Sequence, residues 1–220
     1  MALNQHRQEI SPLPRRSPDA WIAEAEAVGL LVDLELALAG AALDALGRLP
    51  AHTYLAVNVS PETALSERLL GLLEGPNANR IVLEVTEHMP IDDYEGMREA
   101  LEGPRERGVR FAIDDTGAGF ASLRHIVRLE PDFIKLDITL TRGIEGDPVR
   151  RALAAALVSF GSQIGAAVVA EGVEGTQQLD VLKCAGIRFV QGFYLGEPGP
   201  LPEEGSWSRS GSVVPMISES

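Results

Sequence analysis

Two adjacent carboxylates at the end of a short apolar run are the strongest candidates for chemistry in this sequence. Residues 109–113 read Val-Arg-Phe-Ala-Ile, Asp114 and Asp115 come next, and Gly117 and Gly119 follow shortly after. Side chains alternate between the two faces of a strand, so both acids can serve one site only where the strand ends and its backbone turns. We expect the two glycines to supply that turn. Taken alone, the pattern is equally typical of an ordinary loop between a strand and a helix, with Asp as the helix cap.

Further polar residues stand at the C-terminal ends of the other expected strands. They are Asn58, Glu84, Lys135, Glu171 and Gln191. In a parallel barrel the C-terminal ends of all strands lie on one face, where barrel active sites are built. Each residue by itself has a structural explanation, such as a turn cap or a buried hydrogen bond. Their recurrence at strand after strand instead predicts one site that they share with the two aspartates.

The expected site is rich in carboxylates and contains one amide oxygen from Asn58. Such hard oxygen ligands suit Mg²⁺ or Mn²⁺, and the His or Cys ligands that zinc sites usually show are missing from the set. Neighbouring aspartates can bridge two cations, and two cations a few ångströms apart can clamp a phosphodiester during an in-line displacement. Lys135 could hold the attacking water or offset phosphoryl charge. The residues therefore point to metal-dependent hydrolysis of a phosphodiester.

Six short apolar segments are expected to form the strands that position these residues. They span residues 54–59, 80–85, 109–114, 132–136 and 166–170, and the sixth begins at residue 188. Helices are expected from Ser17-Pro18 to Gly29, over 31–49, from Ser60-Pro61 onward, over 91–107 and over 148–164. Strands that alternate with such helices are typical of parallel βαβ units, and uniformly apolar strands are typical of a parallel sheet covered on both faces. The sequence therefore predicts an α/β fold.

Length and charge restrict the partners. The chain has 220 residues and a formal charge of −13, which disfavours polymeric nucleic acid and anionic membranes as partners because both are bound through Lys and Arg. Cys184 is the only cysteine, so the chain can form neither an internal disulfide nor a thiolate zinc cluster. The start lacks the apolar core of a signal peptide, and no apolar run approaches the roughly 18 residues of a membrane span. We expect a soluble, cytoplasmic protein.

Six motifs, taken in chain order, resemble the EAL-domain family of bacterial signalling proteins. They are Asn58-Val-Ser60, Glu84-Val-Thr-Glu87, Asp114-Asp-Thr-Gly-Ala-Gly-Phe-Ala-Ser-Leu123, Asp132-Phe-Ile-Lys-Leu-Asp137, Val169-Ala-Glu-Gly-Val-Glu174 and Gln191-Gly-Phe-Tyr-Leu-Gly-Glu-Pro198. The resemblance implies an α/β fold of modified TIM (β/α)8 barrel type over residues 17–200, lacking the first strand and most of the second. Residues 1–16 would then be an N-terminal segment with a remnant of the signature strand, and residues 201–220 a flexible tail. It also implies hydrolysis of the second messenger cyclic di-GMP to pGpG with Mg²⁺ or Mn²⁺.

The resemblance also implies roles for the metal-binding residues. It makes Asn58, Glu84 and Asp114 ligands of one metal ion, and it makes Asp115 a ligand that helps to hold the second. Glu171 would be either a general base or an organiser of the second metal.

Other implied roles concern the substrate and a flexible loop. Lys135 would be the partner of the nucleophilic water, and Gln191 would line the substrate pocket together with Asn58. Glu87 would anchor the loop 116–123 that links the site to dimerisation. Thr116 and Glu174 are assigned to the same anchoring group.

Several positions depart from the family pattern. Thr116 and Phe120 stand where Phe and Tyr are usual, and Glu197 replaces a residue that is commonly basic. Met1 stands where the signature Glu is expected, and Gln5 stands where an Arg that grips substrate phosphate is expected. A Met thioether is a poor ligand for a hard cation, and a neutral amide offers no charge-assisted fork to a phosphate. We therefore expect weak hydrolysis, if the chain hydrolyses the nucleotide at all.

Two functional classes stay open on the sequence. The chain is either a metal-dependent cyclic di-GMP phosphodiesterase or a catalytically degenerate member that acts as a nucleotide sensor or protein-interaction module. In both cases the missing first strand would leave unpaired sheet edges, which favour pairing with another chain. We therefore expect a homodimer or other self-association.

Overall fold

The protein is built around one parallel sheet of six strands. The computed structural model describes residues 17–86, 91–116, 120–197 and 199. The strands are β1 (Leu55–Asn58), β2 (Ile81–Thr86), β3 (Arg110–Thr116), β4 (Phe133–Leu136), β5 (Ala167–Ala170) and β6 (Phe189–Val190). They lie side by side in chain order, and each pair of neighbours is parallel. All six predicted strands are confirmed, with boundaries that differ by one or two residues.

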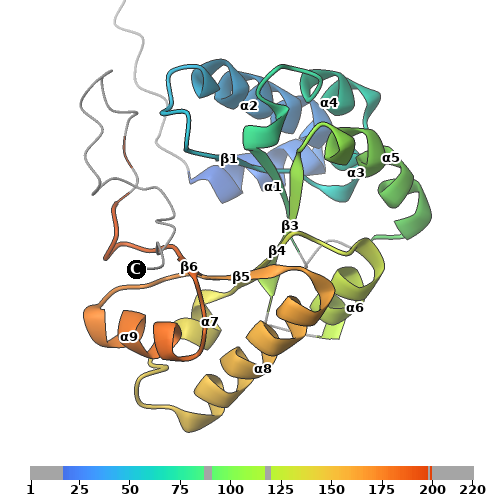
Figure 1. Cartoon of the computed structure of the whole chain (residues 1–220). Coiled ribbons are helices and arrows are strands. Elements are labelled where there is room, and N and C mark those ends of the chain that lie inside the picture. The colour runs from blue at the N-terminus through green and yellow to red at the C-terminus, as the bar shows by residue number, and fades with distance from the viewer. Residues whose placement is uncertain (1–16, 87–90, 117–119, 198, 200–220) are drawn as a thin grey trace, which may run out of the picture.

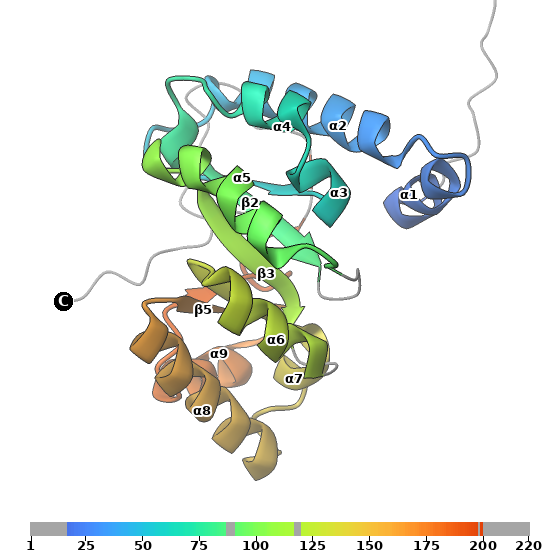
Figure 2. The same cartoon turned by 90° about the vertical axis from the view of Figure 1, so that its right-hand side faces the viewer.

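Helices connect the strands and cover the sheet. They are α1 (Pro18–Ala27), α2 (Leu31–Leu46), α3 (Pro61–Ala64), α4 (Glu67–Leu72), the 3-10 turn η1 (Ala78–Arg80), α5 (Tyr94–Glu106), α6 (Phe120–Leu129), α7 (Ile138–Thr141), α8 (Pro148–Ile164) and α9 (Thr176–Cys184). Helix α2 packs on β1, α6 on β3 and α8 on β5. In Figures 1 and 2 the helices lie along the outside of a curved sheet. The arrangement is a half-barrel of TIM type, which confirms the predicted fold class.

The helix boundaries follow from local capping chemistry. Ser17 caps α1 through its side-chain oxygen, which accepts from the Ala20 amide at 3.3 Å, and Pro18 occupies the first turn. Asp93 caps α5 in the same way through the Gly96 amide at 2.8 Å. This cap explains why α5 begins at Tyr94 rather than at the predicted residue 91.

The strand side chains that point away from the barrel interior form the core with the helices. Leu83, Ile113 and Ile134, from three successive strands, have no exposed surface. They belong to a cluster that also contains Met97 of α5 and Leu36 of α2. Burial of such side chains stabilises the fold by about 1.5–3 kcal/mol each. This packing fixes the positions of the strand ends.

The two outer strands each have one paired edge within the described part of the chain. β1 pairs only with β2, and β6 pairs only with β5. Along β1, Val57 is buried whereas Tyr54, Ala56 and Asn58 are exposed, so one face of this strand is uncovered. The predicted N-terminal segment 1–16 and the predicted tail 201–220 lie outside the described residues. No helix in the described ranges is long and apolar enough to cross a membrane.

Candidate active site

The end of β3 carries two acids, and the backbone changes direction between them. Pairing of β3 with β4 is regular up to Ile113 and shifts before Thr116. Asp115 lies in the left-handed region with φ of 54°, and its amide donates to Asp114 Oδ1 at 2.9 Å. The left-handed conformation costs roughly 1–2 kcal/mol in a residue with a side chain, although Asp tolerates it better than most. A local irregularity of β3 thus lies at Asp115, whereas the turn predicted at Gly117 and Gly119 lies outside the described residues and stays a prediction.

Lys135 lies at the centre of three carboxylates that come from three other parts of the sheet. Its Nζ atom lies 2.8 Å from Glu84 Oε2 of β2, 2.9 Å from Asp114 Oδ1 of β3, and 2.8 Å from Glu171 Oε1 directly after β5. Lys135, Glu84 and Asp114 are buried, with at most 9% of each residue exposed. The structure thus brings together four of the predicted site residues, on the face where the sequence places them.

Burial and charge shift the pKa values of this cluster. Burial raises the pKa of Glu171 to about 6, and the neighbouring Lys135 only partly offsets this effect. Burial likewise raises the pKa of Glu84 above its ordinary value, again against the influence of Lys135. Burial acts to lower the pKa of Lys135, but the carboxylates of Glu84, Glu171 and Asp114 outweigh it and raise that pKa well above its ordinary range. Lys135 therefore keeps its proton at any working pH.

Three of the acids are close enough to share a cation. Asp114, Asp115 and Glu171 each offer a carboxylate oxygen, and these oxygens lie within 4.8 Å of one another. A set of oxygen ligands alone suits a hard divalent cation. The residues present therefore fit Mg²⁺ or Mn²⁺.

Asn58 and Gln191 lie on either side of this cluster in the sheet, at the ends of the two outer strands β1 and β6. Asn58 ends β1 directly opposite Glu84 in the register of β2. Gln191 follows β6, and its main-chain N–H donates to the Ala170 carbonyl at 2.8 Å, next to Glu171. Both residues are exposed, so their side chains are open to a ligand. Their predicted role in substrate binding stays a prediction.

The predicted loop-anchoring residues have different surroundings. Thr116 is buried, and its hydroxyl lies 3.5 Å from the Ile113 carbonyl. Glu174 is exposed, and its carboxylate lies 3.9 Å from the Arg142 guanidinium. Glu87, Met1 and Gln5 lie outside the described residues. The anchoring role of all three predicted residues, Glu87 included, stays a prediction.

Two buried residues that support Glu171 were not predicted from the sequence. The Thr141 hydroxyl of α7 donates to the Glu171 carbonyl at 2.5 Å, and the Gln178 side chain of α9 holds the segment that follows Glu171. Thr141 carries no recognisable sequence signal. Gln178 stands four residues after Glu174 and offers only the weak signal of a polar side chain on the buried face of a short helix.

Comparison with known proteins identifies the family. A family model described as EAL domain matches residues 5–198. The chain belongs to the EAL domain family. The site described above lies entirely within the matched residues, and the resemblance inferred from the six motifs is confirmed.

Individual relatives agree with this assignment. The cyclic di-GMP phosphodiesterase PdeL of Escherichia coli strain K12 is 30% identical over 193 residues, which cover 83% of this chain and 53% of PdeL. Klebsiella pneumoniae BlrP1, solved in a manganese and cyclic di-GMP complex at pH 9.0, is 32% identical with a TM-score of 0.69, over 81% of this chain and 47% of that chain. The EAL domain of Xanthomonas citri FimX, solved with cyclic di-GMP, has a TM-score of 0.75 at 23% identity, over 86% of this chain and 79% of that domain, and shows the shared fold. The chain thus spans about half the length of PdeL and BlrP1.

Proposed function

We propose that this chain hydrolyses cyclic di-GMP to pGpG in a reaction that depends on Mg²⁺ or Mn²⁺. The observation that carries the proposal is the buried cluster in which Lys135 contacts Glu84, Asp114 and Glu171 at 2.8–2.9 Å, with Asp115 beside them. The family membership and the cyclic di-GMP named in the solved relatives support the choice of substrate.

The acids and the amide divide into two groups of metal ligands. Asn58, Glu84 and Asp114, from β1, β2 and β3, would hold one cation, and Asp115 with Glu171 would hold the second. A pair of cations bound there would polarise the phosphodiester and lower the pKa of the attacking water. The left-handed backbone at Asp115 contributes by presenting two consecutive acids to one site.

Glu171 would either accept a proton from the attacking water or organise the second cation. Without a cation its pKa is raised by burial to about 6, and a bound cation would lower that pKa and keep the carboxylate ionised. Lys135 cannot accept a proton, because its raised pKa keeps the ammonium charged. Lys135 instead offers a fixed positive charge that hydrogen-bonds the water or the phosphoryl oxygens.

A second candidate function is binding of cyclic di-GMP without turnover, as a sensor or interaction module. It is favoured by Met1 and Gln5, which stand where the family pattern has Glu and Arg. Loss of one anionic ligand would misplace one cation of a pair, and a small misplacement can reduce the rate by on the order of a hundredfold. We therefore propose that hydrolysis by this chain is weak.

One experiment separates these functions. The release of pGpG is measured with Mn²⁺ for the 220-residue chain, for its Asp114→Asn variant, and for a version preceded by a family-like hairpin that restores Glu and Arg. We expect slow turnover by the chain, none by the variant and faster turnover by the extended version. Cyclic di-GMP binding by calorimetry without any turnover would instead support the sensor. If the chain shows no binding and no turnover, both functions are contradicted.

Self-association is a further part of the proposal. The edges of β1 and β6 that have no partner strand in the described part of the chain leave backbone hydrogen-bonding groups available to a second copy. A homodimer in solution would agree with the homodimerisation that the sequence predicts.

A further inference from the structure

The backbone around Glu171 is held in place by side chains from α7 and α9 in addition to main-chain hydrogen bonds to neighbouring strands. We propose that Thr141 and Gln178 are positioning residues, which set the place of the Glu171 carboxylate within the metal-binding cluster. The inference deepens the proposed function, and its expected effect on pGpG release rests on that function. Its effect on cation binding is measurable whether or not the chain turns over substrate.

Thr141 holds Glu171 directly. The Thr141 hydroxyl donates to the Glu171 carbonyl at 2.5 Å, and Thr141 has no exposed surface. On the other side of the same residue, the Glu171 amide donates to the Leu136 carbonyl of β4 at 3.1 Å. The two bonds hold both peptide groups of Glu171. An unsatisfied buried carbonyl would cost about 1–3 kcal/mol, so loss of the hydroxyl would allow this peptide to move.

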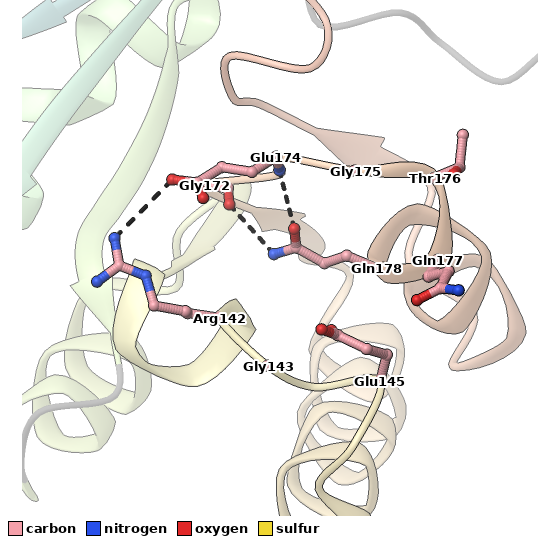
Figure 3. Close-up of a pocket in the computed structure, with 9 residues that line it drawn as sticks. All are labelled: Arg142, Gly143, Glu145, Gly172, Glu174, Gly175, Thr176, Gln177 and Gln178. Atoms are coloured by element: carbon pink, nitrogen blue, oxygen red, sulfur yellow. Dashed lines mark hydrogen bonds and ion pairs between the residues drawn. The ribbon is translucent and has the colours of Figure 1, made fainter.

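Gln178 holds two of the three residues that follow, Gly172 and Glu174. Its Oε1 atom accepts from the Glu174 amide at 2.8 Å, and its Nε2 atom donates to the carbonyls of Gly172 at 3.1 Å and Thr141 at 3.0 Å. Figure 3 shows this side chain reaching from α9 towards the segment from Gly172 to Glu174. The amide thus uses both its donors and an acceptor, while only 7% of the residue is exposed. One side chain therefore links α7, α9 and the Glu171 segment.

The segment has little other support on this side. A cavity of about 350 Å³ lies beside it, lined among others by Arg142, Glu145 and Glu174. The ion pair between Arg142 and Glu174 spans 3.9 Å with both side chains more than half exposed, and such surface pairs contribute little to stability. On the cavity side the segment is held by the hydrogen bonds of Gln178, whereas on the side of β6 the Val173 amide donates to the Gln191 carbonyl at 3.0 Å.

The segment also runs close to α7. Gly172 has φ of +64°, and a Cβ atom there would lie 2.3 Å from the Ile138 side chain. The chain therefore approaches α7 as closely as only glycine permits. This close approach brings the Glu171 carbonyl within reach of Thr141, one turn further along α7.

The position of the Glu171 carboxylate depends on this support. The carboxylate lies 2.8 Å from Lys135 Nζ and within 4.8 Å of the oxygens of Asp114 and Asp115. Residues that orient a metal ligand typically change metal affinity or activity by about 10–100-fold when they are removed. We expect changes of this size on loss of the Thr141 hydroxyl or of the Gln178 amide.

The experiment uses two pairs of matched variants in the 220-residue chain. Thr141→Val removes the hydroxyl at nearly constant volume, and Thr141→Ser keeps it. Gln178→Glu replaces the donor group that faces two carbonyls, and Gln177→Glu makes the same change on the exposed neighbouring residue. Folding is checked by circular dichroism, Mn²⁺ binding by calorimetry, and pGpG release by kcat and KM.

We expect Thr141→Val and Gln178→Glu to weaken Mn²⁺ binding by about 10-fold or more and to lower kcat by about 10–100-fold. KM should change little, because the displaced carboxylate acts on the transition state rather than on substrate binding. Thr141→Ser and Gln177→Glu should behave like the wild type.

Other results overturn the inference. Folded Thr141→Val and Gln178→Glu proteins that bind Mn²⁺ with wild-type affinity would show that these residues do not position the ligand. If Thr141→Val and Gln178→Glu both unfold, the two residues support general stability rather than the position of the ligand. If Gln177→Glu weakens Mn²⁺ binding as much as Gln178→Glu, the added charge alone is the cause. If the wild type binds Mn²⁺ without releasing pGpG, the proposed hydrolysis is wrong. The Mn²⁺ affinities of the variants and the wild type then still test the positioning role. A wild type that does not bind Mn²⁺ overturns both.

Discussion

Replacement of Lys135 by Met tests the electrostatic arrangement of the site most directly. The substitution keeps a long side chain but removes the only ammonium that contacts Glu84, Asp114 and Glu171, as far as the described residues show. The three carboxylates would then face one another without a positive partner. The chain supplies a matched control, because Lys183 on the exposed face of α9 is the only other lysine in the sequence.

The expected size of the effect follows from burial. The side chains of Lys135, Glu84 and Asp114 are 7%, 10% and 12% exposed, so the pairs are buried rather than surface ion pairs. Removal of one partner from a buried ion pair typically costs about 3–5 kcal/mol. For a domain of this size 1 kcal/mol shifts Tm by about 2–4 °C, so we expect Lys135→Met to lower Tm by roughly 6–20 °C without metal.

The loss of stability caused by Lys135→Met should depend on pH. Glu171 has a pKa of about 6 in the folded protein, and the pKa of Glu84 is also raised, so both acids protonate in the folded state before they would in the unfolded chain. Without Lys135 these pKa values rise further, because the ammonium lowers them. The stability cost of Lys135→Met should therefore be small near pH 4.5 and grow as the pH rises through 6 and above.

The assay is thermal unfolding followed by circular dichroism in a metal chelator, from pH 4.5 to 8, for the wild type, Lys135→Met and Lys183→Met. The scans are repeated with millimolar Mn²⁺, which should restore more stability to Lys135→Met than to the wild type because the cation replaces the lost charge. Equal Tm values for the two lysine variants at pH 7.5 without metal would refute the reasoning, and so would a cost that is independent of pH.

Three further predictions follow from the same structure. Glu171→Gln should remove the part of the pH dependence of wild-type stability that comes from Glu171. Because the pKa of Glu171 is about 6 when folded and 4.5 ordinarily, wild-type stability without metal should fall by about 1.5 kcal/mol relative to the variant as the pH rises from 4.5 to 6.5, as urea unfolding would measure. Asp114→Asn should reduce the gain in Tm that Mn²⁺ produces, and equal gains in variant and wild type would argue against a cation at this acid. The wild type should self-associate through the edges of β1 and β6, so a strictly monomeric species in light scattering at high concentration would contradict that expectation.

The strands and the identity of most site residues could be predicted from the sequence. Apolar runs such as 109–113 form strands because their local composition favours a buried parallel sheet, and that preference needs no knowledge of distant residues. Helix starts such as Ser17-Pro18 are local for the same reason. Because parallel strands end on one face, the site residues Glu84, Asp114 and Lys135 could be assigned to a common site before their distances were known.

The geometry of the site depended on the tertiary structure. No local pattern predicts the left-handed conformation of Asp115 within β3, which Asp tolerates better than most residues. Lys135 was predicted as a partner of water. Its contacts with three carboxylates arise from the register of four strands, and register depends on how distant segments pack.

The support of Glu171 shows the same limit most clearly. Thr141 and Gln178 lie 30 residues before and seven residues after Glu171, on two short helices whose relative position no local pattern predicts. Their hydrogen bonds exist because α7 and α9 pack on either side of one segment next to a cavity. Residue types and strand ends follow from local physical chemistry, whereas distances, charge partners and supporting residues come from long-range packing.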